Sequence, residues 1–294
     1  MALLSVLIVA LRWRYLNEPF DNDITIRMSY AMAATHGAVY YSDLFAFGPP
    51  GSLWVNELFV RLLGGNEYAV FAMGSSCSLL TMWGIAALAL RWSGSVAALV
   101  AAAIWAALSI GISTEANQPN AEAYVMALTV WGFVLLQPPL QDGRPASWPL
   151  AAVAAGLLFF LATAVKHHMV FMPLCAFLAH GLIRWRQPAG EPMLNRWLIA
   201  AAVVGACWAG LLGYYAFTGR LVALWDGLVG HSLAYAAAQG GVLANLKANL
   251  VFDQLVPEVQ RSQLLLYALL LVVAVGGALL RWMPGMLLLG WSLG

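Results

Sequence analysis

Long apolar runs, separated by short polar segments, dominate the chain. The runs are roughly 17 to 20 residues long, enough for a helix to cross a hydrocarbon core of about 30 Å. They lack the alternation of apolar and polar residues that a membrane β-strand requires. Helices and closed barrels are the only structures that satisfy every backbone group inside lipid. The pattern therefore predicts an all-α, polytopic membrane protein.

The same pattern predicts about eight to nine transmembrane helices. The predicted spans are residues 2–16, 69–90, 94–113, 122–137, 149–165, 168–184, 197–217 and 263–281, and a ninth begins at 284. Only Lys166-His167-His168 separates the fifth span from the sixth, and a merger of the two would invert all later topology. The first run is short and the last stops within a span. The sequence is therefore expected to be a fragment of a longer transmembrane domain.

Charged residues divide the loops into two sets. One set holds Arg91, Arg144, Arg184, Arg186, Arg196 and Arg281, with Asp142 and Glu191 as its acids. The alternate loops hold the other eleven of the thirteen acidic residues. Because short basic loops stay in the cytoplasm, the acid-rich loops are expected to face outward.

Residues 1–294 are interpreted as one transmembrane domain with two long outer loops, 17–68 and 218–262. In the first loop, 24–35 and 53–63 have amphipathic spacing typical of helices that lie in the membrane interface. The predicted apolar faces are Ile24, Met28, Ala31 and Met32 in one helix, and Leu58, Phe59, Leu62 and Leu63 in the other.

Composition supports the membrane assignment and excludes other classes. Hydrophobic residues make up 62% of the 294 and charged residues only 9%, against about 25% in a soluble domain. A net charge of +1 does not suggest a nucleic-acid surface. Three cysteines lie inside apolar runs, as packing residues do, and no metal-binding spacing is present. No resident metal or cofactor is predicted, although outer-loop carboxylates leave a divalent cation open.

Three polar groups on predicted outer connections are candidates for chemistry. The first is Asp21-Asn22-Asp23, followed by Arg27 and Asp43. Such carboxylates serve as a general base toward an acceptor hydroxyl, or hold a divalent cation. The structural alternative is a solvated loop in which Asp23 caps the helix that starts at Ile24.

The second group is the connection at 114–122, which carries Glu115, Asn117 and Glu122. Its density of polar side chains between two apolar helices suggests a site. An acid at the start of a span also favours the helix dipole, so capping explains Glu122 equally well.

The third group is Lys166-His167-His168, at the outer end of the fifth span. A lysine and two histidines at headgroup depth suit a phosphate, since adjacent histidines point different ways on a helix and make a poor metal pair. Snorkelling of Lys166 is the structural alternative. If a bundle brought the three groups together, they would provide a base, a second acid and a phosphate anchor.

The first predicted outer loop resembles that of a known family. Asp23, Tyr30-Ala31, Gly37, the segment Tyr40-Tyr41-Ser42-Asp43-Leu44-Phe45 and the turn Pro49-Pro50-Gly51 follow in the order and spacing of GT-C glycosyltransferases. The nearest branch is the family-39-related group of protein O-mannosyltransferases and the aminoarabinose transferase of lipid A. The resemblance covers residues 15–65 by motif, and the rest by topology and the placing of Glu122 and Lys166-His167.

The resemblance implies a membrane enzyme that transfers a sugar from a polyprenyl-phosphate donor at its external face. It makes Asp23 the base, Glu122 or Glu115 the second acid, and Lys166 and His167 contacts to the donor phosphate. Many members have an acidic pair where this chain has Asp23-Ile24, so Asp21 is a further candidate.

By the same resemblance, the acceptor would be a glycan, lipid or protein at the periplasmic or extracellular side of a bacterial inner membrane. Two hypotheses from other classes stay open on the residues alone. A transporter or lipid flippase would show ionisable residues near the midplane and an internal repeat. A membrane scaffold would leave the acidic loops merely solvated.

Overall fold

The computed structural model describes residues 1–46, 48–110, 119–137, 148–186 and 193–238, and these residues form an all-helical structure. The α-helices are α1 (Ala2–Trp13), α2 (Asn22–Thr35), α3 (Gly51–Leu63), α4 (Glu67–Leu108), α5 (Ala121–Leu136), α6 (Trp148–Val165), α7 (Phe171–Arg186), α8 (Met193–Phe217), α9 (Leu221–Trp225) and α10 (His231–Ala238). A short 3-10 helix, η2 (His167–Val170), precedes α7, and a π-helix, η3 (Asp226–Gly230), joins α9 to α10.

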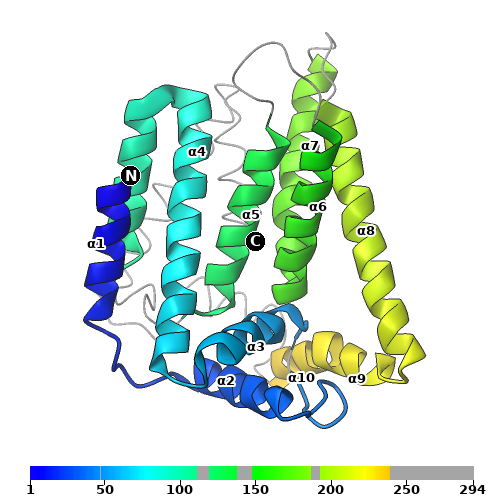
Figure 1. The fold of residues 1–294 in the computed structure, drawn as a ribbon. Coiled ribbons are helices and arrows are strands. Elements are labelled where there is room, and N and C mark those ends of the chain that lie inside the picture. Colours follow the sequence, from blue (N-terminus) through cyan, green and yellow to red (C-terminus); the bar gives the residue numbers. More distant parts are fainter. Residues whose placement is uncertain (47, 111–118, 138–147, 187–192, 239–294) are drawn as a thin grey trace.

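Long helices stand side by side, and α2, α3, α9 and α10 lie across one end of this bundle (Figure 1). A helix or part of one occupies each span predicted up to residue 217. The span predicted at 69–90 and most of that predicted at 94–113 fall on the two legs of α4, which reverses at Gly94, where φ is +84°, and ends at Leu108. Glycine suits this turn because it has no Cβ to oppose the left-handed conformation. The span predicted at 263–281 and the outer loop beyond residue 238 lie outside the described residues.

Two of the described helices, α4 and α8, are long and apolar enough to cross a membrane. In their most apolar stretches only 22% and 11% of the residues are buried inside the protein. Large apolar side chains such as Leu80, Leu99 and Leu198 are about half exposed. Exposed apolar faces of this length would be costly in water, and lipid removes that cost. The length and the exposed apolar faces of α4 and α8 therefore suit a lipid environment.

The two ends of the bundle differ in their charged groups. At the C-terminal end of α5, Arg91 donates to the Val134 carbonyl and Arg196 donates to the Leu136 carbonyl. Cations favour the negative end of a helix dipole. Glu122 lies in the first turn of α5, at the other end of the bundle. Two arginines that the sequence places in the basic loops are thus a full helix length away from the acids.

Lys166-His167-His168 marks a real interruption between α6 and α7. The α-helix stops at Val165, and η2 follows before α7 begins at Phe171. The start of α8 lies beside the end of α5 through Arg196, and its last turn reaches the opposite end, where Tyr215 packs on Tyr41. The chain therefore crosses back along α7, and the fifth and sixth apolar runs are separate helices.

Helices α2 and α3 use their apolar faces differently. In α2 the face of Ile24, Met28 and Ala31 is buried against Val60, Ala69 and Val70 of α3 and α4, so it packs on protein rather than on lipid. In α3 the predicted face is largely open: Leu58, Leu62 and Leu63 are exposed, while Leu53 and Val60 on other sides are buried. A helix apolar on both sides suits a position between the bundle and the membrane interface.

Gly205, Ala209 and Gly213 recur every four residues along α8, a spacing that would let a neighbouring helix approach closely, but the described residues make no close approach at the two glycines. A Cβ added at Gly205 or Gly213 would meet nothing within 4 Å. The close approach of α8 is instead made at Gly156 of α6, where an added Cβ would lie 2.7 Å from the Ala200 carbonyl oxygen. A small-residue spacing allows close packing but does not choose which face of the helix is used.

Gly51, the first residue of α3, allows that helix to approach the end of α6, and Gly51→Ala is expected to destabilise the fold. The new Cβ would lie 2.6 Å from the carbonyl carbon and oxygen of Ala164, which are backbone atoms that cannot rotate away. Overpacking of this kind costs roughly 1–3 kcal/mol. Thermal unfolding in detergent would measure it, with Gly213→Ala as the control. Equal melting temperatures for the two variants would contradict the expected clash.

Candidate functional site

The site begins at the first turn of α2. The Asp21 side chain caps the helix, accepting from the Ile24 amide at 2.6 Å. Asp23, one turn in, pairs through Oδ2 with the Arg27 guanidinium at 3.0 Å, in i,i+4 spacing. Its side chain is 59% exposed, whereas that of Arg27 is 16% exposed. Asp21 therefore shapes the helix end, and Asp23 presents a carboxylate to the outside.

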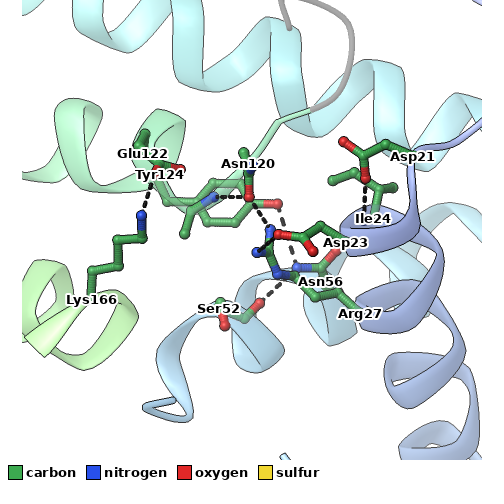
Figure 2. Close-up of polar contacts among 11 residues, drawn as sticks. Asp21, Asp23, Ile24, Arg27, Ser52, Asn56, Asn120, Glu122, Tyr124 and Lys166 are labelled. Atoms are coloured by element: carbon green, nitrogen blue, oxygen red, sulfur yellow. Dashed lines mark hydrogen bonds and ion pairs between the residues drawn. The ribbon is translucent and has the colours of Figure 1, made fainter. Parts of the chain in front are cut away.

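Arg27 connects α2 to the start of α5. Its second terminal nitrogen donates to Oδ1 of Asn120 at 2.7 Å. Asn120 is the N-cap of α5, and the same oxygen accepts from the Ala121 amide at 3.0 Å. A guanidinium suits this place because its planar fork serves two acceptors at once. One arginine thus fixes Asp23 relative to the N-terminus of α5 (Figure 2).

Glu122 and Lys166 form the opposite side of the site. Lys166 immediately follows α6, and its ammonium forms a salt bridge with Oε1 of Glu122 in the first turn of α5. Both side chains are accessible: that of Lys166 is 31% exposed and that of Glu122 is 57% exposed. An ammonium has three donors, so Lys166 can hold Glu122 and a further anion together. Asp23, Glu122 and Lys166 are thereby gathered around one helix N-terminus.

Two buried polar residues beneath the site, Asn56 and Tyr124, are not among the residues predicted from the sequence. Asn56 of α3 is fully buried and donates to the Ser52 carbonyl at 2.7 Å and to the Tyr124 hydroxyl at 3.4 Å. Tyr124 of α5 is 2% exposed and also contacts the Met73 sulfur at 3.1 Å. The signal for Asn56 is an amide inside the apolar stretch Leu-Trp-Val-Asn-Glu-Leu-Phe. These contacts fix α3 to α5 directly below Arg27 and Asn120.

The remaining predicted residues fall into three groups. Asp43 accepts from the Val39 amide at 2.9 Å within its own loop. His167 lies in η2 beside Lys166, and burial lowers the pKa of its imidazole, which favours the neutral form. His168 is in the same turn, but its side chain is outside the described part, as are Glu115 and Asn117. At neutral pH, Lys166 rather than His167 therefore supplies positive charge at this corner.

The arrangement can bind an anion beside a base. The N-terminus of α5 carries partial positive charge, and Arg27 and Lys166 lie on either side of it. Asp23 adds a carboxylate whose Oδ1 is left available by the pairing of Oδ2 with Arg27. Among the residues that the structure describes, no three His, Cys, Asp or Glu side chains cluster as a metal site.

Arg27→Lys is expected to loosen this arrangement. A lysine can keep the i,i+4 pair with Asp23 but cannot also reach Asn120 in the same geometry. The lost interhelix hydrogen bond is worth about 1 kcal/mol, which thermal unfolding in detergent would detect. Arg61→Lys is the matched control, because Arg61 hydrogen-bonds Glu57 four residues earlier on α3. If both variants melt together, the link to Asn120 contributes nothing to the stability of the fold.

Comparison with known proteins adds a family to this geometry. The model of the dolichyl-phosphate-mannose-protein mannosyltransferase family matches residues 48–209, more than half of the chain. The match includes Asn56, Asn120, Glu122 and Lys166, and it begins after Asp23. No curated protein and no solved structure matches. The resemblance seen in the sequence is confirmed: this chain belongs to the dolichyl-phosphate-mannose-protein mannosyltransferase family, and it is a membrane glycosyltransferase whose donor is a lipid-phosphate sugar.

Proposed function

We propose that the chain transfers a sugar from a polyprenyl-phosphate donor to an acceptor hydroxyl, with Asp23 as the general base and Lys166 as the anchor of the donor phosphate. The observation that carries the proposal is the connected set of contacts from Asp23 through Arg27 and Asn120 to the N-terminus of α5, where Glu122 holds Lys166. A base and a cation on opposite sides of one helix end suit a reaction that removes a proton and releases a phosphate.

The proposed reaction is a single displacement at the anomeric carbon of the sugar. Asp23 takes the proton of the acceptor hydroxyl while that oxygen forms its bond to the anomeric carbon. The bond from this carbon to the phosphate oxygen breaks, and its electron pair leaves with the lipid phosphate. Lys166 and the α5 N-terminus stabilise the charge that develops on that phosphate, while Arg27 holds Asp23 on the other side. The base and the leaving group are on opposite faces of the sugar, so the configuration inverts.

The other carboxylates have supporting roles in this proposal. Asp21 holds the first turn of α2 through its cap, which positions Asp23. Glu122 orients the Lys166 ammonium toward the α5 N-terminus. His167 and His168 follow Lys166 in the chain and are proposed as further contacts to the donor phosphate, since a neutral imidazole such as that of His167 has one N–H to donate.

The reaction is assigned to the outer face of a cell membrane, as in the bacterial cell envelope. The support is the position of two arginines from short basic loops: Arg91 and Arg196 bind carbonyls at the C-terminal end of α5, a full helix length away from Glu122 in its first turn. Short loops rich in arginine stay in the cytoplasm. The donor lipid reaches such a site laterally from the bilayer, and the acceptor is a glycan, lipid or protein of the outer compartment.

The test is sugar transfer by membranes that contain the full-length protein. A panel of radiolabelled polyprenyl-phosphate sugars, including mannose and aminoarabinose, would be incubated with these membranes and with matched membranes lacking the protein. Release of polyprenyl phosphate together with label in a non-donor product supports the proposal. Movement of intact labelled donor across the bilayer without transfer would support the flippase hypothesis instead and overturn the enzymatic one.

A further inference from the structure

A second site lies at the same end of the bundle, away from Asp23. It is a pocket of about 250 Å³ between the end of α2, one side of α3 and the last turn of α8. Four aromatic residues and two of opposite charge contribute to its wall: Tyr40, Trp54, Tyr214, Tyr215, Glu57 and Arg220. Drug-sized ligands occupy cavities of roughly 300–1,000 Å³, so this volume suits a single ring.

Arg220 is held in place by the protein rather than left free in solvent. Its guanidinium donates to the Thr218 hydroxyl at 3.1 Å, the Tyr40 carbonyl at 3.1 Å and the Tyr214 hydroxyl at 2.8 Å. It also lies 5.2 Å from the ring centroids of Tyr214 and Tyr215. An arginine has five N–H groups, and three are used here, which leaves two for a ligand. The pocket therefore presents fixed donors next to aromatic faces.

Glu57 supplies acceptors on the opposite wall. Arg61 donates both of its hydrogen bonds to Oε1, the Tyr40 hydroxyl lies beside the carboxylate, and the Glu57 side chain is 21% exposed. Burial, followed by the nearby Glu57 carboxylate, raises the pKa of the Tyr40 hydroxyl, which keeps it protonated. The carboxylate and the guanidinium together leave the pocket without an excess of either charge.

These features distinguish between kinds of ligand. A phosphate or carboxylate would be attracted by Arg220 but repelled by the Glu57 carboxylate. An alkyl chain would displace the water around both charged groups without replacing the hydrogen bonds that this water makes. A sugar ring has hydroxyls that donate to Glu57 and accept from Arg220. Its C–H groups pack on the negative faces of aromatic rings.

We propose that this pocket binds one sugar ring of a saccharide, and that this saccharide is the acceptor of the transfer reaction. Only the second part of this proposal, that the saccharide is the acceptor, rests on the proposed function. Ala34, which lines the pocket, is eleven residues after Asp23 on α2, or roughly 16 Å at 1.5 Å per residue. The ring in the pocket is therefore not the one that reacts. The acceptor is a glycan of several units, with one end here and its reacting hydroxyl at Asp23.

Binding can be tested in the absence of donor. Saturation-transfer NMR on the full chain in lipid nanodiscs would use mannotriose and maltotriose as neutral probes and glycerol phosphate as the anionic probe. At least one trisaccharide is expected to bind. Trp54→Ala should raise its Kd about tenfold, and Glu57→Gln should raise it as well. Trp225→Ala is the control, because Trp225 is 59% exposed and does not line the pocket.

Three results would overturn the proposal. One is the absence of trisaccharide binding by protein that unfolds cooperatively. Another is binding that neither Trp54→Ala nor Glu57→Gln weakens. The third is binding of glycerol phosphate alone, lost in Arg220→Gln, which would identify an anion site. Because the binding experiments contain no donor, their results do not depend on whether the protein transfers sugar. Failure of the proposed function can therefore be told apart from failure of this inference.

Discussion

Asp23→Asn is expected to lower kcat for sugar transfer by about 10²–10⁴-fold, the usual contribution of a positioned general base. The amide keeps the size of the side chain and can still accept a hydrogen bond from Arg27, so the link to Asn120 should survive. It cannot take the proton of the acceptor hydroxyl. The KM for the donor should therefore change little, because the phosphate contacts lie with Lys166. Steady-state assays of both constants on purified protein would check this.

Asp21→Asn is the matched comparison for that variant. Asn caps a helix as well as Asp does, so the bond to the Ile24 amide should be kept, and activity should stay within a few-fold of wild type. If Asp21→Asn removed activity while Asp23→Asn preserved it, the base would have to be reassigned to Asp21. Equal and complete loss in both variants, with unchanged melting temperatures, would indicate that the two carboxylates act together.

The helices of the bundle were predictable because their signal is local. Apolar runs of membrane length predict a helix wherever they occur, and the described helices up to residue 217 follow that pattern. The break at Lys166-His167-His168 was also readable, since three polar residues there interrupt an apolar run. What could not be read was the use of each face. The stripe of α2 is as apolar as an interfacial helix requires, yet α3 and α4 cover it.

The charged residues of the candidate site can be picked out from the sequence, but the contacts between them cannot. Asp23, Glu122 and Lys166 stand out as charges beside apolar runs, and each is locally visible. The bond from Arg27 to Asn120 spans 93 positions, and no local pattern reports it. The sequence does not single out Asn56 or Tyr124, because one amide in an amphipathic helix and one tyrosine in an apolar helix are both common. Only packing shows that this amide faces α5.

The pocket near Arg220 was beyond sequence reasoning for a related reason. Its wall comes from the end of α2, from α3 and from the last turn of α8, and the hydrogen bond from Arg220 to the Tyr40 carbonyl joins residues 180 positions apart. The tyrosines and the arginine would each pass as ordinary interfacial residues of a membrane protein. The fold brings them together in one pocket: the backbone turns at Tyr41, where φ is +61°, and the neighbouring Tyr40 carbonyl accepts a hydrogen bond from Arg220.

Lys166→Met is expected to lower kcat/KM for the donor by about 10²–10³-fold, the cost of removing one group that stabilises developing charge. Methionine keeps an unbranched apolar stem but cannot stabilise the leaving phosphate. Stability should change little, because Glu122 is 57% exposed and is solvated once its partner is lost. The variant should therefore lose activity while its melting temperature stays close to that of the wild type, which distinguishes a functional cation from a structural one.

The pair with Glu122 provides the control for this result, through a double-mutant cycle. If Glu122 acts only by orienting Lys166, Glu122→Gln should cost about tenfold or less, and adding it to Lys166→Met should cost nothing further. If Glu122 is a second acid in the reaction, Glu122→Gln should instead approach the loss seen for Asp23→Asn, and the double variant should be worse than either single one. Donor kinetics of the four proteins decide between these roles, and full activity of Lys166→Met would remove the phosphate anchor from the proposed mechanism.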